Sequence, residues 1–166
     1  MTRWILHLFV VLMLWCNNGI AQTNWLHATP KAGELPFEVA IEYKKSDVGK
    51  HLDSLQWIKA GLQKLEAYNG LFKYYLKGFV PSGTDTLYIL SRLHTEELIQ
   101  WVCLFDKNGV LSDYIMAAYD NSEGFLIRET KLLPNGLIEV NEYSEMEGTE
   151  EQFKFTINGL KFRKSN

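Results

Sequence analysis

The chain has 166 residues, of which 46% are hydrophobic and 22% charged, and its formal net charge at pH 7 is −3. A balance this close to neutrality creates no strong field for nucleic acid or for anionic lipid. The composition therefore excludes a protein that binds nucleic acid through a basic surface.

The first 21 residues have the order of a secretory signal peptide. Arg3 supplies a positive charge, the segment 4–15 is apolar except for a histidine, and Gly19 and Ala21 are small residues suited to a signal peptidase. We expect cleavage after Ala21 and export to the periplasm or the extracellular space. The alternative is an uncleaved membrane anchor, but the apolar run is shorter than the roughly 20 residues that span a bilayer.

A lipid anchor is disfavoured because Trp15, a large residue, precedes Cys16. Removal of 1–21 leaves 145 residues with 16 basic and 20 acidic side chains, a net charge of −4, and no further segment that could cross a membrane. Cys103 is then the only cysteine, so no internal disulfide can form, and its apolar surroundings favour a small buried hydrophobe over a reactive thiol.

The mature chain begins with a polar segment, 22–34, which we expect to be a flexible lead before a single β-rich domain, 35–166. Trp25 in this lead could anchor a partner or a glycan. Apolar residues then alternate with others over 37–43, which predicts a half-buried strand.

One helix is predicted, over 53–68. Leu55, Ile58, Leu62 and Leu65 recur at three- and four-residue steps and would share its buried face. Asp53 or Ser54 could cap its start, and the Asn-Gly pair at 69–70 could end it. A glycine at position 61 weakens this prediction.

From Leu71 onward, aromatic and β-branched segments alternate with turn residues at 81–83, 106–109, 121–124, 134–136, 148 and 158–159. This spacing predicts an antiparallel meander. The expected fold is α+β and mainly β: a strongly curved or barrel-like antiparallel sheet with the N-terminal helix packed on it.

The Pro-Asn-Gly turn at 134–136 fixes the register of one hairpin. It suits a type I turn followed by a glycine bulge, which places Lys131 opposite Glu139 and Arg128 opposite Glu142. Both pairs have opposite charges, and this supports the register.

Two further hairpins are expected. A two-residue turn at 158–159 would place Phe155 opposite Phe162 and give one apolar and one basic face. A loop at 107–109 would join two strands that are apolar on both sides, with Ile115 on the same face as Trp101. We expect this hairpin to lie centrally, covered on one face by the helix and on the other by a curled or second sheet.

Patterns of established catalytic chemistry are absent from the sequence, including nucleophile elbows, phosphate-binding loops and zinc motifs. His94 with the carboxylates at 96 and 97 could form a general base, although turns collect such residues for solubility. The segment 106–113 superficially suggests a calcium loop, but it lacks the glycine and glutamate spacing of that motif. No metal and no cofactor are expected.

Six glutamates lie in 139–151 without an intervening lysine or arginine. We regard Glu142, Glu145 and Glu147 as candidate binding residues for a cationic partner. The alternative is a solvated strand edge that Lys131 and Arg128 partly neutralise.

The sequence as a whole favours a non-catalytic binding module of the cell envelope or extracellular space, with a protein, glycan or lipid partner. Two alternatives remain: a secreted hydrolase that uses carboxylates and His94, and a carrier of apolar ligands with an interior cavity. A pocket that holds His94 and a carboxylate would favour the hydrolase, and a closed apolar cavity would favour the carrier.

Overall fold

The computed structural model describes residues 25–26, 28–41, 49–95, 97–120 and 126–165. The predicted signal peptide 1–21 and its cleavage point lie outside these residues. Within the described part of the chain, no helix is long and apolar enough to span a membrane.

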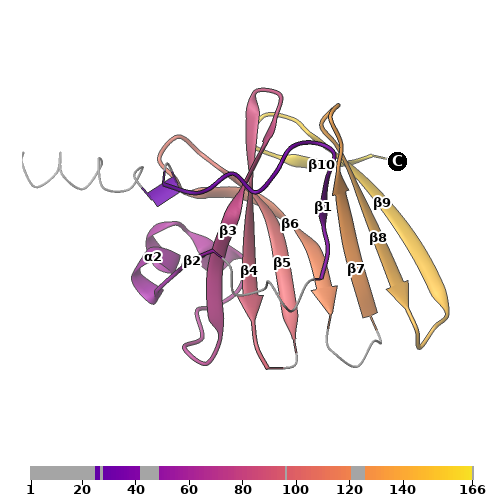
Figure 1. Ribbon diagram of the computed structural model, residues 1–166, viewed down its shortest axis with the longest axis horizontal. Coiled ribbons are helices and arrows are strands. Elements are labelled where there is room, and N and C mark those ends of the chain that lie inside the picture. Colours follow the sequence, from indigo (N-terminus) through magenta and orange to yellow (C-terminus); the bar gives the residue numbers. More distant parts are fainter. Residues whose placement is uncertain (1–24, 27, 42–48, 96, 121–125, 166) are drawn as a thin grey trace, which may run out of the picture.

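The chain forms a 10-stranded antiparallel sheet with the order β10-β9-β8-β7-β6-β5-β4-β3-β2, and β1 pairs with β7 beside this path (Figure 1). The strands are β1 (Phe37–Val39), β2 (Lys50–His51), β3 (Lys73–Ser82), β4 (Asp85–Leu93), β5 (Leu98–Phe105), β6 (Leu111–Asp120), β7 (Leu126–Leu132), β8 (Leu137–Ser144), β9 (Thr149–Ile157) and β10 (Phe162–Ser165). The predicted meander is therefore confirmed. The sheet is not a closed barrel, because β2 and β10 end the hydrogen-bonded path.

Two clusters of apolar side chains lie on the opposite faces of β3–β6. The first joins them to the helical segment and to Leu26, and the second joins them to β1 and to β7–β10. Every residue of β5 is buried. The prediction that the β5–β6 hairpin is central and covered on both faces is confirmed, and this double coverage explains why its sequence lacks a polar face.

The predicted helix is shorter than expected. It begins at Ser54 and ends at Lys59 (α2), and a single 3₁₀ turn, η2 (Leu62–Lys64), follows. Asp53 is the N-cap: its Oδ1 accepts a hydrogen bond from the Gln56 amide at 2.8 Å, and the Gln56 side chain accepts one from the Asp53 amide at 3.1 Å.

The helix cannot continue past Gly61, because the φ of 69° at this residue is left-handed and incompatible with an α-helix. The predicted buried face is also wrong in part. Leu55 and Ile58 are 57% and 55% exposed, whereas Trp57 is fully buried. Trp57 is the buried residue of α2, and its indole lies 4.3 Å from the Tyr74 ring of β3.

The strand expected at 37–43 is β1, and it is limited to Phe37–Val39. Ala40 and Ile41 are not in a strand, and 42–43 lie outside the described residues.

Parts of the expected lead 22–34 contact the domain. Leu26 and Thr29 are buried, and the Trp25 ring lies edge-on to Phe105 at 5.5 Å. Trp25 thus contacts the core, although its proposed role as an anchor stays untested.

The register of the β7–β8 hairpin is confirmed. Lys131 lies opposite Glu139 and Arg128 opposite Glu142, and the Gly136 φ of 75° fits the predicted glycine bulge. Of the two expected ion pairs across this hairpin, only one forms between the described residues. Arg128 does contact Glu142, but Glu139 pairs with Lys154 of β9 at 3.1 Å.

The other two hairpins differ from the predicted pairing, the last one in the position of its turn and the β5–β6 hairpin by a bulge. In the last hairpin Phe162 pairs with Ile157 rather than Phe155, because the Asn158 amide bonds the Lys161 carbonyl and the turn lies one residue later. The shift of two residues preserves which face is apolar.

In the β5–β6 hairpin, Phe105 pairs with Leu111 as expected, but Leu104 pairs with Asp113, so Ser112 is an extra residue. This bulge places Met116 opposite Trp101 and moves Ile115 to the other face, contrary to the prediction.

Candidate functional site

The three predicted acidic residues lie at the β8–β9 hairpin, but only two of them share a depression. Glu142 and Glu147 line a shallow pocket of about 220 Å³, together with Glu151, and Glu145 does not line it. Glu142 is already engaged, because its Oε2 accepts a hydrogen bond from Arg128 Nε at 2.7 Å. Lys131, the other expected neutralising cation, lies 3.8 Å from Glu38 instead.

His94 is not brought next to a described carboxylate as a base would require. Its backbone amide bonds the Glu97 carbonyl oxygen at 2.9 Å, its Nδ1 lies 3.3 Å from the Thr95 hydroxyl, and its ring packs edge-on against Phe72. The Glu97 carboxylate turns instead to Arg92. Glu96 lies outside the described residues.

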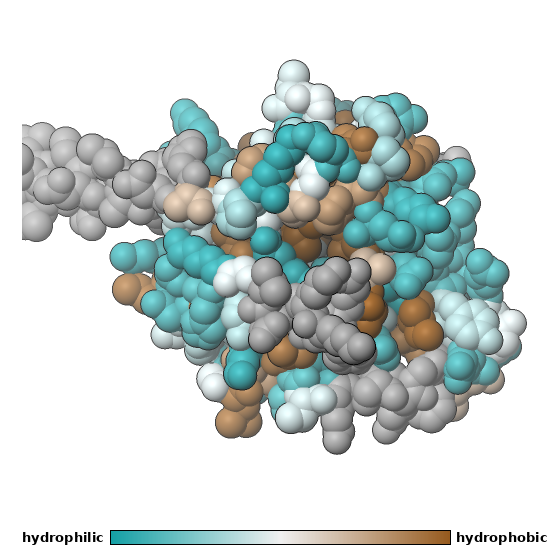
Figure 2. All heavy atoms as spheres, in the orientation of Figure 1, coloured by the Kyte–Doolittle hydropathy of each residue, from teal (hydrophilic) through white to brown (hydrophobic). Residues whose placement is uncertain are grey.

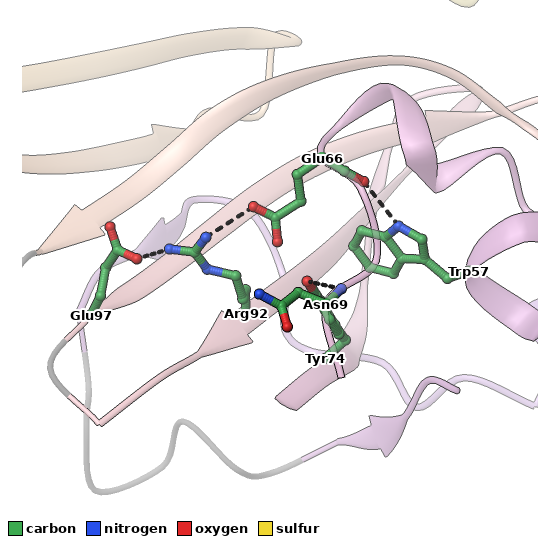
Figure 3. Close-up of polar contacts among 6 residues, drawn as sticks. All are labelled: Trp57, Glu66, Asn69, Tyr74, Arg92 and Glu97. Atoms are coloured by element: carbon green, nitrogen blue, oxygen red, sulfur yellow. Dashed lines mark hydrogen bonds and ion pairs between the residues drawn. The ribbon is translucent and has the colours of Figure 1, made fainter. Parts of the chain in front are cut away.

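Arg92 joins two carboxylates beside the first core cluster (Figure 3). Its guanidinium contacts Glu66 Oε2 at 2.9 Å and Glu97 Oε2, and its Cζ lies 4.5 Å from the centre of the Phe72 ring. The Arg92 side chain is only 9% exposed. The Arg92–Glu66 ion pair links the segment after η2 to β4, a role that the sequence did not suggest.

Two buried side chains of the first core cluster, Tyr74 and Cys103, have raised pKa values. Burial raises the pKa of Tyr74 to about 12, and the neighbouring Glu66 carboxylate adds to the rise, while a hydrogen bond from the Asn69 amide opposes it. Burial likewise raises the pKa of the Cys103 thiol well above its ordinary value, with Asp113 acting in the same direction. A nucleophilic cysteine needs the opposite shift, so Cys103 has the character of a core residue.

A larger cleft lies on the other face of β4 and β5. The segment 30–40, here called the strap, bonds to β3 at one end, where the Ala32 amide donates to the Phe79 carbonyl at 2.8 Å, and pairs as β1 with β7 at the other. Since β3 and β7 are four strands apart in the sheet, the strap must cross the face between them. Figure 1 shows it passing in front of β3–β6 and descending beside β7.

The cleft beneath the strap has a volume of about 480 Å³. Residues 30–32 and 37–40 form its strap side, and Lys77, Ile89 and Gln100 contribute from the sheet. In the same orientation, Figure 2 shows apolar surface set back near the middle of this face, with polar side chains around it. This size is within the range of small-molecule pockets.

A buried polar pair lies at the floor of the cleft: Gln100 lines the cleft, and Ser91 is its cross-strand neighbour. Gln100 on β5 is 3% exposed, and its Nε2 donates a hydrogen bond to the Ala40 carbonyl at 3.1 Å. Ser91 on β4, directly opposite Gln100, is 1% exposed, and its Oγ finds no partner among the described residues. The only sequence signal for this pair is a single amide inside the apolar run of β5, and it was not among the predicted site residues.

No model of a known protein family matches the chain, and no curated protein and no solved structure matches it either. In the described ranges, no three histidine, cysteine, aspartate or glutamate residues come together in a way that could hold a metal ion. The function is therefore inferred from the geometry of the strap cleft.

Proposed function

We propose that this protein is a non-catalytic binding module of the cell envelope or extracellular space, and that it binds a small, mainly apolar ligand in the strap cleft. The observation that carries the proposal is a cleft of about 480 Å³ over an interior that two apolar clusters otherwise fill. Cleft walls of Phe37, Val39 and Ile89 offer apolar contact, and removal of apolar ligand surface from water would drive binding.

We also propose that the sheet is strongly curved, as the sequence predicts. The short helix would then lie on the convex side of the sheet. Residues of β3–β6 and of β7–β10 belong to one apolar cluster, which supports a sheet that folds back on itself. Such a fold places the strap across the mouth of the curve. Exposed residues, among them Lys31 and Glu38, line the cleft, and this favours a binding module over a carrier with a closed cavity. No described contact of His94 favours the hydrolase.

Binding of the neutral dye N-phenylnaphthylamine tests this proposal, because its fluorescence rises in apolar sites. The protein produced from the full chain is titrated beside an Ala40→Phe variant, in which a ring fills the cleft from the strap. We expect the variant to lower the affinity for the dye by about tenfold or more. Ala40→Leu should give a smaller loss.

The matched control is Ala67→Phe, the same change at an exposed position next to Glu66 and outside the cleft. It should retain the affinity of the unsubstituted protein. Circular dichroism would establish that both variants are folded. Equal dye binding by folded Ala40→Phe and Ala67→Phe variants would refute the cleft as the site.

A further inference from the structure

Gln100 at the floor of the strap cleft, with Ser91 beside it, sets the class of ligand, an inference that rests on the function proposed above. We infer that the cleft selects amphiphiles whose apolar body carries one neutral hydrogen-bonding head group, a hydroxyl or a primary amide. Gln100 and Ser91 would hold this head group. Three features support this assignment: the free capacity of the amide, the unpartnered hydroxyl and the surrounding charges.

Gln100 retains hydrogen-bonding capacity beyond its contact with the strap. A glutamine side chain carries two N–H donors and a carbonyl acceptor. The bond to the Ala40 carbonyl uses one of the donors. Because Gln100 lines the cleft, a ligand placed there could use the second donor or the acceptor.

Ser91 supplies a second polar atom next to this amide. Ile89 and Ser91 are two residues apart on β4 and therefore lie on the same side of the sheet, and Gln100 is the cross-strand neighbour of Ser91. A buried hydroxyl without a hydrogen bond is unfavourable. A ligand head group that bonds Gln100 at the cleft floor and reaches the neighbouring Ser91 hydroxyl would remove this cost.

The charges around the cleft favour a neutral head group. The charged side chains that line it have partners of their own: Lys31 pairs with Glu34, Glu38 lies near Lys131, and Lys77 also makes an interaction. On the sheet side of the cleft, Gln100 lies with the apolar Ile89, and Val39 faces the cleft from the strap. An ion moved to this floor would lose its hydration without gaining a counter-charge.

Four probes that share an octyl chain test this inference: octanamide, octanol, octanoate and octylamine. Each competes with N-phenylnaphthylamine for the protein produced from the full chain, near neutral pH. We expect octanamide and octanol to displace the dye at concentrations about tenfold lower than the two ions. Tighter binding of octanoate or octylamine would overturn the inference.

Substitutions separate recognition of the head group from simple partition of the octyl chain. Gln100→Leu and Ser91→Ala should each weaken octanamide binding about tenfold relative to dye binding. Gln152→Leu, the same change at an exposed position of β9, should leave the affinity for octanamide unchanged. Ser91→Ala is informative even if Gln100→Leu loosens the strap, because it leaves the bond to Ala40 in place.

The outcomes distinguish this inference from the proposed function. If the dye does not bind, or binds equally to the Ala40→Phe variant, then the proposed function fails and the inference fails with it. If the dye binds in the cleft but neither Gln100→Leu nor Ser91→Ala changes octanamide binding, then only the inference is overturned.

Discussion

At the scale of single residues, the most unusual arrangement is the nearly buried guanidinium of Arg92 between Glu66 and Glu97. Breaking a buried ion pair is costly, because the remaining charge stays in a region of low dielectric without its partner. Glu66 already has one oxygen, Oε1, that finds no hydrogen-bond partner among the described residues, so it depends on Arg92 for the other. Glu66 and Arg92 also lie close enough to Tyr74 to influence its pKa (Figure 3).

Replacement of Arg92 by leucine should lower the free energy of unfolding by about 3 kcal/mol, because it leaves the Glu66 and Glu97 carboxylates unpaired. Urea denaturation monitored by tryptophan fluorescence measures this loss. Lys131→Met serves as the control, since it breaks an ion pair whose side chains are 53% and 55% exposed, and it should cost less than about 1 kcal/mol. Equal losses for the two variants would mean that Arg92 has no special role.

Alkaline pH should destabilise the protein through Tyr74. Its pKa is raised from 10.0 to about 12, so between these values the folded protein keeps a proton that the unfolded chain releases. The contribution is fully present below pH 10 and is lost as the pH rises toward 12, by up to about 2 kcal/mol. Unfolding measured between these two pH values should show a shallower decline for Tyr74→Phe. Parallel curves for the two proteins would contradict this assignment.

At the scale of elements, local turn chemistry decides where the helix ends. Gly61 adopts a positive φ, and a Cβ at this position would lie 3.1 Å from Val110 Cγ1. The apolar spacing over 53–68 continues past this glycine, which is why the sequence predicted a longer helix. The Leu62 and Leu65 positions do face the core, but from a 3₁₀ turn and the residues after it.

Gly61→Ala should therefore destabilise the protein by about 1 kcal/mol or more, although alanine is the better helix former. Gly70→Ala is the matched comparison. Gly70 has no positive φ, and a Cβ added there would have nothing within 4 Å, so alanine should be neutral or slightly stabilising. Thermal unfolding of both variants measures the difference, and a stabilising effect of Gly61→Ala would show that the left-handed conformation is not required.

At the scale of the whole molecule, the sheet has a doubly covered centre and a sparsely paired end. β5 is buried at every position, whereas β10 pairs only with Lys154–Ile157 of β9. Among the strands of the described residues, positions 149–153 of β9 therefore have a neighbour, β8, on one side only. The glutamates at 150 and 151 give this edge charges of the kind that discourage pairing with another chain.

Hydrogen exchange should follow this gradient. We expect the amides of β5 to exchange most slowly, because their release requires global unfolding, and those of β10 and of residues 149–153 to exchange much faster. Mass spectrometry of peptic fragments provides the measurement. Protection of the 149–153 fragment equal to that of β5 would indicate that this edge is covered in solution.

Pairing between neighbouring strands could be predicted from the sequence, whereas contacts between layers could not. The opposite charges at Arg128 and Glu142, and the Pro-Asn-Gly turn between their strands, identified a register that the structure confirms. The bulge at Ser112 left no such signal, and one extra residue reversed the predicted face of Ile115. The acidic candidates Glu142, Glu145 and Glu147 stay a prediction, and the strap cleft was not foreseen.

The antiparallel meander follows from the amino-acid sequence alone, because strand periodicity and short turns act between residues that are close along the chain. Which distant groups meet depends on tertiary packing. Gln100 contacts the Ala40 carbonyl across 60 residues, and Arg92 contacts Glu66 across 26. Such pairs form where the packing of the layers brings them together, and no periodicity in the sequence specifies that packing.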